Sequence, residues 1–252
     1  MSKINNKNLI VANWKMHKSS QSADKYMQSF LQLQKSDNIA INSDIVFCPP
    51  FTLVRAIKEY GINVGGQDCS AFSENEGAFT GDISAQMLKD LGCGYVIVGH
   101  SERRKYHQES NELIKQKIAN IHKSGLIAII CIGENLKQRD DGIYRQSLLE
   151  DLEEGMPESA NFHNTIIAYE PLWAIGTGKT ATIDQIEEIH QYLLEKCLSR
   201  FAFSPKIIYG GSVNLENSKA ILDLNNVSGL LIGGASLDPE IFYKIIKIAN
   251  KK

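Results

Sequence analysis

Short, nearly continuous apolar runs alternate along this chain with longer stretches in which apolar residues recur at helical spacing. Because a strand buried on both faces of a parallel sheet has no polar face, runs of this kind predict buried parallel strands. The eight runs span residues 9–14, 44–49, 62–67, 95–100, 126–133, 165–170, 206–211 and 229–234. The stretches between them predict helices.

Three of the intervening stretches have clear helix signals. The segment 19–36 begins with serines suited to capping, and the segment 182–198 begins with Thr182 as a candidate N-cap. In the segment 110–125, apolar residues recur at helical spacing and Gly125 marks the end of the helix.

The repeat arithmetic favours one closed architecture. Eight strand–helix units in 252 residues average about 31 residues each, the size of a βα repeat. Since neither a Ser/Pro-rich linker nor a block of charge interrupts the series, we expect a single domain over residues 1–252. The predicted fold is an α/β protein, a (β/α)8 barrel with eight parallel strands. A doubly wound open sheet is the alternative, although such sheets usually vary more in repeat length.

The composition is that of an ordinary globular protein, with 43% hydrophobic residues, 22% charged residues and a net charge of −2. This charge provides no bulk attraction to nucleic acid or to an anionic membrane. The longest apolar run, 126–132, is far shorter than the roughly 20 residues of a membrane-spanning helix. We therefore expect neither a nucleic-acid nor a membrane partner.

Cysteine usage points to a reducing compartment. The chain has five cysteines, an odd number, and no CxxC pair, so buried free thiols in the cytoplasm are expected. The polar N-terminal residues lack the apolar stretch of a secretory signal. The HExxH motif is absent, and we expect no metal.

Chemistry-bearing residues follow several predicted strands, which is where barrel enzymes place their active sites. Asn13 and Lys15 end the first run, His100 ends the fourth and Glu170 ends the sixth. A lysine could balance a phosphate or a developing oxyanion, although a lone lysine is more often a solvated surface residue. His100 and Glu170 lie two repeats apart and could flank one ligand.

Two glycine-rich turns follow the seventh and eighth runs, at 210–212 and 233–236. Glycine lets backbone N–H groups approach an anion, and barrels often bind phosphate after these two strands. The segment 171–179 has a proline start, an apolar tip and a Gly-Thr-Gly hinge, which predicts a mobile loop. Residues 176–181 match fragments of nucleotide-binding motifs, but the required glycine and strand spacing are missing.

Five segments, in order, resemble the triosephosphate isomerase family. They are NWKM (13–16), GHSERR (99–104), CIGE (131–134), AYEPLWAIGTGK (168–179) and YGGSV (209–213), and the similarity continues to residue 237. The resemblance implies a TIM barrel that interconverts dihydroxyacetone phosphate and glyceraldehyde 3-phosphate through an enediolate, in glycolysis and gluconeogenesis. It implies no cofactor.

The resemblance also implies a role for each matching residue. Glu170 resembles the catalytic base, His100 resembles the electrophile at the carbonyl oxygen, and Lys15 with Asn13 resembles the substrate-binding pair. The donors to the phosphate that it implies are Gly176, Ser212, Gly233 and Gly234.

Two polar residues, Ser101 and Glu102, follow His100 and could begin a short helix that supports it. A helix N-terminus disfavours a positive charge, so this placement would keep the imidazole neutral.

The segment 68–82 is unusually long for a βα loop. In the family it resembles the loop that interdigitates in a homodimer, with Thr80 reaching the neighbour's site near Asn13 and Lys15. A homodimer is therefore expected.

Two other functions compete with the isomerase. One is a different phosphate-binding barrel, such as an aldolase or a ring-isomerising enzyme. An aldolase of the Schiff-base type would use Lys15 as its nucleophile. A catalytically inactive barrel could serve as a scaffold, although the intact Lys15, His100 and Glu170 argue against it.

Overall fold

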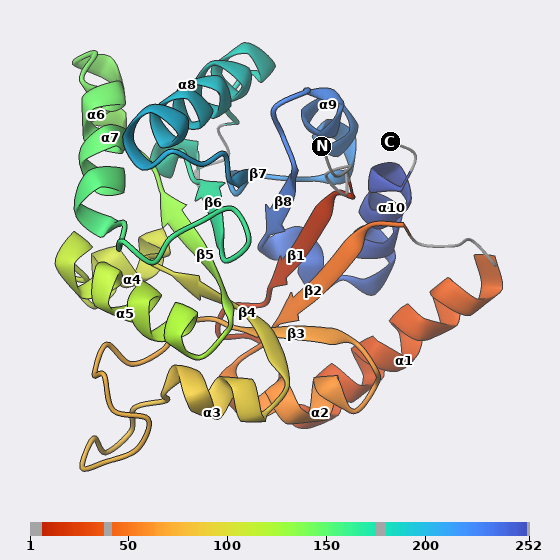
Figure 1. Cartoon of the computed structure of the whole chain (residues 1–252). Coiled ribbons are helices and arrows are strands. Elements are labelled where there is room, and N and C mark those ends of the chain that lie inside the picture. The colour runs from red at the N-terminus through yellow and green to blue at the C-terminus, as the bar shows by residue number, and fades with distance from the viewer. Residues whose placement is uncertain (1–6, 38–41, 175–179, 251–252) are drawn as a thin grey trace.

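The computed structural model describes residues 7–37, 42–174 and 180–250. In this part of the chain, eight parallel strands form a closed barrel in sequence order, with the last strand paired to the first (Figure 1). The strands are β1 (Leu9–Asn13), β2 (Asp44–Cys48), β3 (Asn63–Gly66), β4 (Cys93–Val98), β5 (Ile127–Ile132), β6 (Thr165–Tyr169), β7 (Lys206–Tyr209) and β8 (Gly229–Ile232).

Helices surround the barrel (Figure 1). They are α1 (Ser20–Asp37), α2 (Val54–Lys58), α3 (Ala85–Asp90), α4 (Ser101–Tyr106), α5 (Asn111–Lys123), α6 (Leu136–Asp140), α7 (Tyr144–Gly155), α8 (Ile183–Phe201), α9 (Leu215–Asp223) and α10 (Pro239–Ala249). Short 3-10 segments lie at η1 (Phe51–Leu53), η2 (Leu172–Ala174) and η3 (Gly234–Leu237).

The predicted barrel is confirmed, and each apolar run overlaps one strand, although β4 begins two residues before its run. The reason for the unbroken apolar runs is visible in β1, where Leu9 and Val11 belong to the cluster inside the barrel. The alternate residues Ile10 and Ala12 belong to the cluster between strands and helices. Successive side chains of a strand point to opposite faces, so both faces of β1 are buried. The open-sheet alternative is wrong because β8 closes on β1.

The three predicted helices are also present. Thr182 caps α8 by accepting a hydrogen bond from the backbone N–H of Gln185, and it forms a capping box. Ser110 caps α5 in the same way, and Gly125 has φ +69° just after that helix, a conformation suited to glycine.

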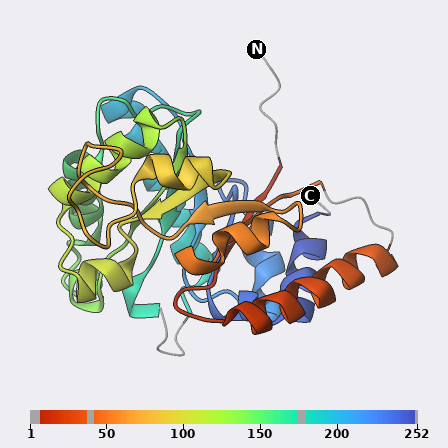
Figure 2. The same ribbon diagram turned by 90° about the horizontal axis from the view of Figure 1, so that it is seen from below.

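The first and last helices, α1 and α10, pack against each other and lie side by side (Figure 2). Aromatic rings fill the contact, including Phe30 at 6.0 Å from Phe242. The loop from Gln67 to Ser84, between β3 and α3, extends away from the barrel (Figure 1).

The five cysteines are buried and free, as expected. Within the described residues, none of the helices combines the length and apolar character that crossing a membrane requires.

Candidate active site

A cavity of about 790 Å³ opens at the carboxyl ends of the strands. Residues that follow β1, β4, β6, β7 and β8 line it, so the barrel gathers side chains that are far apart in the sequence. It brings together most of the residues singled out in the sequence, namely Asn13, Lys15, His100, Ser101, Glu102, Glu170, Ser212, Gly233 and Gly234.

The imidazole of His100 lies between two hydrogen-bonding groups. His100 is the N-cap of α4, the short helix expected after it, and its Nδ1 accepts a hydrogen bond from the backbone N–H of Glu102 at 3.2 Å. An Nδ1 atom that accepts leaves the ring proton on Nε2, so this contact assigns a neutral ring. Nε2 then points its proton toward Glu170 Oε1, 3.2 Å away.

The carboxylate of Glu170 is buried, with 1% of the residue exposed. Its second oxygen, Oε2, accepts a hydrogen bond from the backbone N–H of Ser101 at 3.1 Å. The first turn of α4 therefore contacts both the carboxylate and the imidazole. A helix N-terminus stabilises negative charge and disfavours positive charge, which suits an ionised Glu170 beside a neutral His100.

The ammonium group of Lys15 enters the cavity from a strained backbone position, with φ +52°. Two local contacts hold that conformation: the Lys15 N–H donates to Asn13 Oδ1 at 3.1 Å, and Gln67 Nε2 donates to the Lys15 carbonyl at 2.8 Å. The intervening Trp14 is fully buried against Tyr26, with ring centroids 4.9 Å apart. Lys15 Nζ pairs with Glu102 Oε1 at 2.5 Å.

The glycine turns leave room for the reactive side chains. A Cβ on Gly210 would lie 3.0 Å from Glu170 Cγ, and one on Gly233 would lie 3.3 Å from Lys15 Cε. The hydroxyl of Ser212 donates to the Ala174 carbonyl at 2.5 Å, which ties the turn after β7 to η2. Glycine at these two positions therefore makes room for the Glu170 and Lys15 side chains.

Behind η2 lies the fully buried carboxylate of Glu134. Its Oε1 accepts hydrogen bonds from Trp173 Nε1 at 2.9 Å and from the Tyr169 hydroxyl at 3.1 Å, and Arg139 Nη1 lies 3.3 Å away. Burial, followed by the negative charge of Glu134, raises the pKa of Tyr169 well above its usual value. The start of the predicted mobile loop is thus attached to the barrel through Trp173.

Of the remaining predicted residues, Thr80 does not line this cavity. Gly176 lies outside the described residues, together with the whole predicted Gly-Thr-Gly hinge. Thr80 lies exposed on the loop between β3 and α3.

Several lining residues were missed by the sequence reasoning, including Leu172, Val213, Leu231, Lys105 and Tyr106. Leu172 and Val213 fall inside quoted motifs but have no polar group that would single them out. Lys105 and Tyr106 lie on α4, directly after GHSERR, and their position on a helix beside the site was the available signal.

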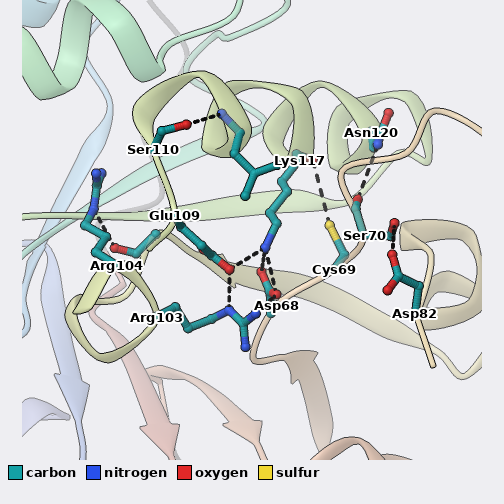
Figure 3. A network of polar contacts seen from close by, with 12 residues as sticks. Asp68, Cys69, Ser70, Asp82, Arg103, Arg104, Glu109, Ser110, Lys117 and Asn120 are labelled. Carbon is teal, nitrogen blue, oxygen red and sulfur yellow. Dashed lines mark hydrogen bonds and ion pairs between the residues drawn. The ribbon is translucent and has the colours of Figure 1, made fainter. Parts of the chain in front are cut away.

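A buried ion cluster lies behind α4, at the base of the β3–α3 loop (Figure 3). Lys117 Nζ contacts Asp68 Oδ2 at 2.8 Å and Glu109 Oε1 at 2.6 Å, and Arg103 contacts the same two carboxylates at 2.8 and 2.7 Å. Burial raises the pKa of Asp68, although Lys117 and Arg103 oppose that shift. Burial acts in the same direction on Glu109, but hydrogen bonds from both cations hold its pKa below the usual value.

Among the described residues, no group of three or more His, Cys, Asp or Glu side chains is arranged to hold a metal ion. Cys131 lies inside the barrel near Glu170, and burial raises the pKa of its thiol, with the Glu170 carboxylate adding to the shift. It is therefore a buried, protonated thiol beside the carboxylate.

The fold and the cavity together define an α/β-barrel enzyme with a carboxylate, a neutral imidazole and an ammonium group beside glycine-rich turns. The chain belongs to the triosephosphate isomerase family, whose model matches residues 8–249. It is an isomerase, which removes the aldolase and scaffold alternatives.

Individual relatives support the same family. The triosephosphate isomerase of Thermodesulfovibrio yellowstonii is 42% identical over 246 residues, which cover 96% of this chain and 99% of the relative. That of Dictyoglomus thermophilum is 41% identical over 250 residues, 95% of this chain and 98% of the relative. The crystal structure of triosephosphate isomerase from Bartonella henselae matches with a TM-score of 0.84 at 34% identity, covering 96% of this chain and 98% of that chain.

Proposed function

We propose that Glu170, His100 and Lys15 perform the reaction by which this isomerase interconverts dihydroxyacetone phosphate and glyceraldehyde 3-phosphate. The observation that supports it best is the arrangement of His100, with Nδ1 accepting from the Glu102 N–H and Nε2 lying 3.2 Å from Glu170 Oε1. A base and a neutral hydrogen-bond donor then face the same small volume.

The reaction needs a base because a proton on the carbon next to a carbonyl is only weakly acidic. Glu170 removes that proton, and the carbonyl oxygen becomes the enediolate oxygen. The hydroxyl proton on the carbon that lost its hydrogen then passes to this oxygen, and the carboxylic acid of Glu170 returns its proton to the former carbonyl carbon, which leaves the new carbonyl on the other carbon. His100 Nε2–H hydrogen-bonds the oxygen on which negative charge develops. A fixed donor in a dry site stabilises that charge without reorganisation during the step.

Lys15 adds a positive charge to the same cavity, and Asn13 sets its backbone through the hydrogen bond to the Lys15 N–H. The turns after β7 and β8 supply the phosphate donors, with Ser212, Gly233 and Gly234 as the proposed residues. The cavity contains both the catalytic side chains and the proposed phosphate donors. One three-carbon phosphate can therefore contact the base, the electrophile and the phosphate donors at the same time. Gly176 as a further phosphate donor, and closure of the loop around it, stay predictions.

The test is Glu170→Asp, which shortens the base by one methylene and moves the carboxylate back by more than 1 Å. Misplacement of that size costs about 100-fold in rate, so we expect kcat to fall by about that factor with KM little changed. Exposed Glu158 gives the control, Glu158→Asp, which should keep full activity in a coupled assay for triose phosphate interconversion. Near-normal turnover of Glu170→Asp would mean that another group is the base.

A homodimer belongs to the same proposal. The β3–α3 loop extends from the barrel and carries Phe72, which is 52% exposed, and Met16 next to the site is 94% exposed. A second copy would cover these apolar side chains and place Thr80 near the neighbour's Asn13. Sedimentation at working concentration should give twice the 28.1 kDa chain mass; a fully active monomer would contradict it.

We further propose that residues 1–252 form one domain and that the protein works in the cytoplasm. The unbroken series of strands and helices supports the first statement. The five buried free thiols support the second.

A further inference from the structure

Arg104 on α4 connects two strands at the base of the site. Its Nε donates to the Gly99 carbonyl at 2.9 Å, and its Nη2 donates to the Cys131 carbonyl at 3.4 Å. Gly99 follows β4 and Cys131 belongs to β5. A guanidinium is planar and presents its donors in a fixed fork, so the two carbonyls are held in one geometry.

The carbonyl held by Nε belongs to the peptide unit that joins Gly99 to His100. Because a peptide bond is planar, fixing the Gly99 oxygen also fixes the backbone nitrogen of His100. Gly99 has φ +66°, and a Cβ there would lie 2.9 Å from Ile114 Cδ1 and 3.3 Å from Arg104 Nη2. The turn that presents His100 is therefore closed tightly against the guanidinium.

The outer end of the fork is also held. Arg104 Nη1 donates to Asn111 Oδ1 at 2.6 Å, and Asn111 Nδ2 in turn donates to Asp151 Oδ1 at 3.1 Å and Glu154 Oε2 at 2.9 Å. All three guanidinium nitrogens of Arg104 are thus engaged by protein groups, although the residue lines the cavity. The neighbouring Arg103 instead points into the buried ion cluster, where it pairs with Glu109 (Figure 3).

We infer that Arg104 is a positioning residue for His100: its guanidinium fixes the Gly99–His100 peptide and so sets where the imidazole meets the substrate oxygen. This inference rests on the proposed role of His100 as the electrophile. Arg104 itself contacts no substrate. A lysine would keep the charge but could not reproduce the fork, because its single nitrogen offers one point of attachment.

The experiment is Arg104→Ala, assayed with and without added guanidinium chloride at a concentration that leaves the parent folded. A displaced imidazole predicts that kcat falls by about 10- to 100-fold while KM stays within about threefold, since phosphate binding depends on turns after β7 and β8. Guanidinium should restore part of kcat in this variant, and sodium chloride at equal concentration should not. The control is Arg200→Ala, which removes an exposed partner of Glu153 and should neither lose activity nor respond to guanidinium.

Two further variants keep the inference testable if Arg104→Ala does not fold. Arg104→Lys should lower kcat with KM preserved, and Asn111→Ala should do the same to a smaller degree because it frees only the outer nitrogen. A rise in KM at constant kcat would show that Arg104 binds substrate, and unchanged kcat in folded Arg104→Lys would show that it positions nothing. Either result overturns the inference, whereas an inactive parent would instead refute the proposed function.

Discussion

Gly133, the residue after β5, sits against the backbone of the proposed base. A Cβ built on Gly133 would lie 1.7 Å from the carbonyl oxygen of Glu170 and 2.6 Å from its carbonyl carbon. The two segments are joined at this point by the hydrogen bond from the Glu170 N–H to the Ile132 carbonyl at 2.8 Å. Gly133→Ala therefore displaces the base without touching its side chain.

The size of the displacement follows from the contact. Real Cβ atoms essentially never approach another heavy atom closer than 3.0 Å, so the 1.7 Å contact requires the two backbones to separate by about 1.3 Å. A 1 Å misplacement of a catalytic group costs about 100-fold in rate. We expect kcat of Gly133→Ala to fall by about that factor, and the strain to lower stability by about 1–3 kcal/mol.

The assay compares kcat and KM of Gly133→Ala with those of the parent, for both directions of the isomerisation. Circular dichroism and thermal melting first show that the variant is folded. The matched control is Gly155→Ala at the last residue of α7, where a Cβ meets no atom within 4 Å outside the adjacent backbone and alanine is a better helix former than glycine. It should keep full activity and melt at the same temperature or higher. A folded Gly133→Ala variant with kcat within threefold of the parent would refute the reasoning.

Two stability predictions concern buried ionisable groups. Burial lowers the pKa of His190 to about 4 from 6.5, so the unfolded chain takes up this proton at a higher pH than the folded chain. The contribution of His190 to the free energy of unfolding is therefore fully present above pH 6.5, and about 3 kcal/mol of it is lost as the pH falls to 4. The measurement is the unfolding free energy from denaturant titrations at several pH values between 7 and 4. His190→Gln should make this free energy less dependent on pH, and exposed His163→Gln should leave the dependence unchanged. Equal pH dependence in both variants and the parent would contradict the argument. Lys117→Met leaves Asp68 and Glu109 sharing one cation and should cost about 3–5 kcal/mol of unfolding free energy at fixed protein concentration; a loss under 1 kcal/mol would show that the carboxylates find other partners.

Much of the fold follows from local patterns that need no tertiary information. The strands are apolar on both faces, as β1 shows with Leu9 inside the barrel and Ile10 outside it. Thr182 begins α8 because a side-chain oxygen can satisfy the first free N–H groups of a helix wherever it occurs. The count of repeats then favours closure, since eight βα units complete a barrel.

The positions of Lys15, His100 and Glu170 at strand ends follow from the same pattern, because parallel strands in a barrel all end on one face. The tautomer of His100 does not follow from it: that is decided by the Glu102 N–H reaching Nδ1 at 3.2 Å. The need for glycine at 133 likewise exists only because Glu170 passes against it.

The sequence by itself determined which segments are strands and helices, how many units repeat and which reactive side chains reach the open end of the barrel. These properties depend on neighbours a few residues apart. Only the tertiary structure decided that Arg104 holds the Gly99 and Cys131 carbonyls and that Lys117 lies between Asp68 and Glu109. The contacts of Arg104 with Cys131 and of Lys117 with Asp68 join residues from different repeats. All of these hydrogen bonds depend on tenths of an ångström that the order of residues along the chain does not specify.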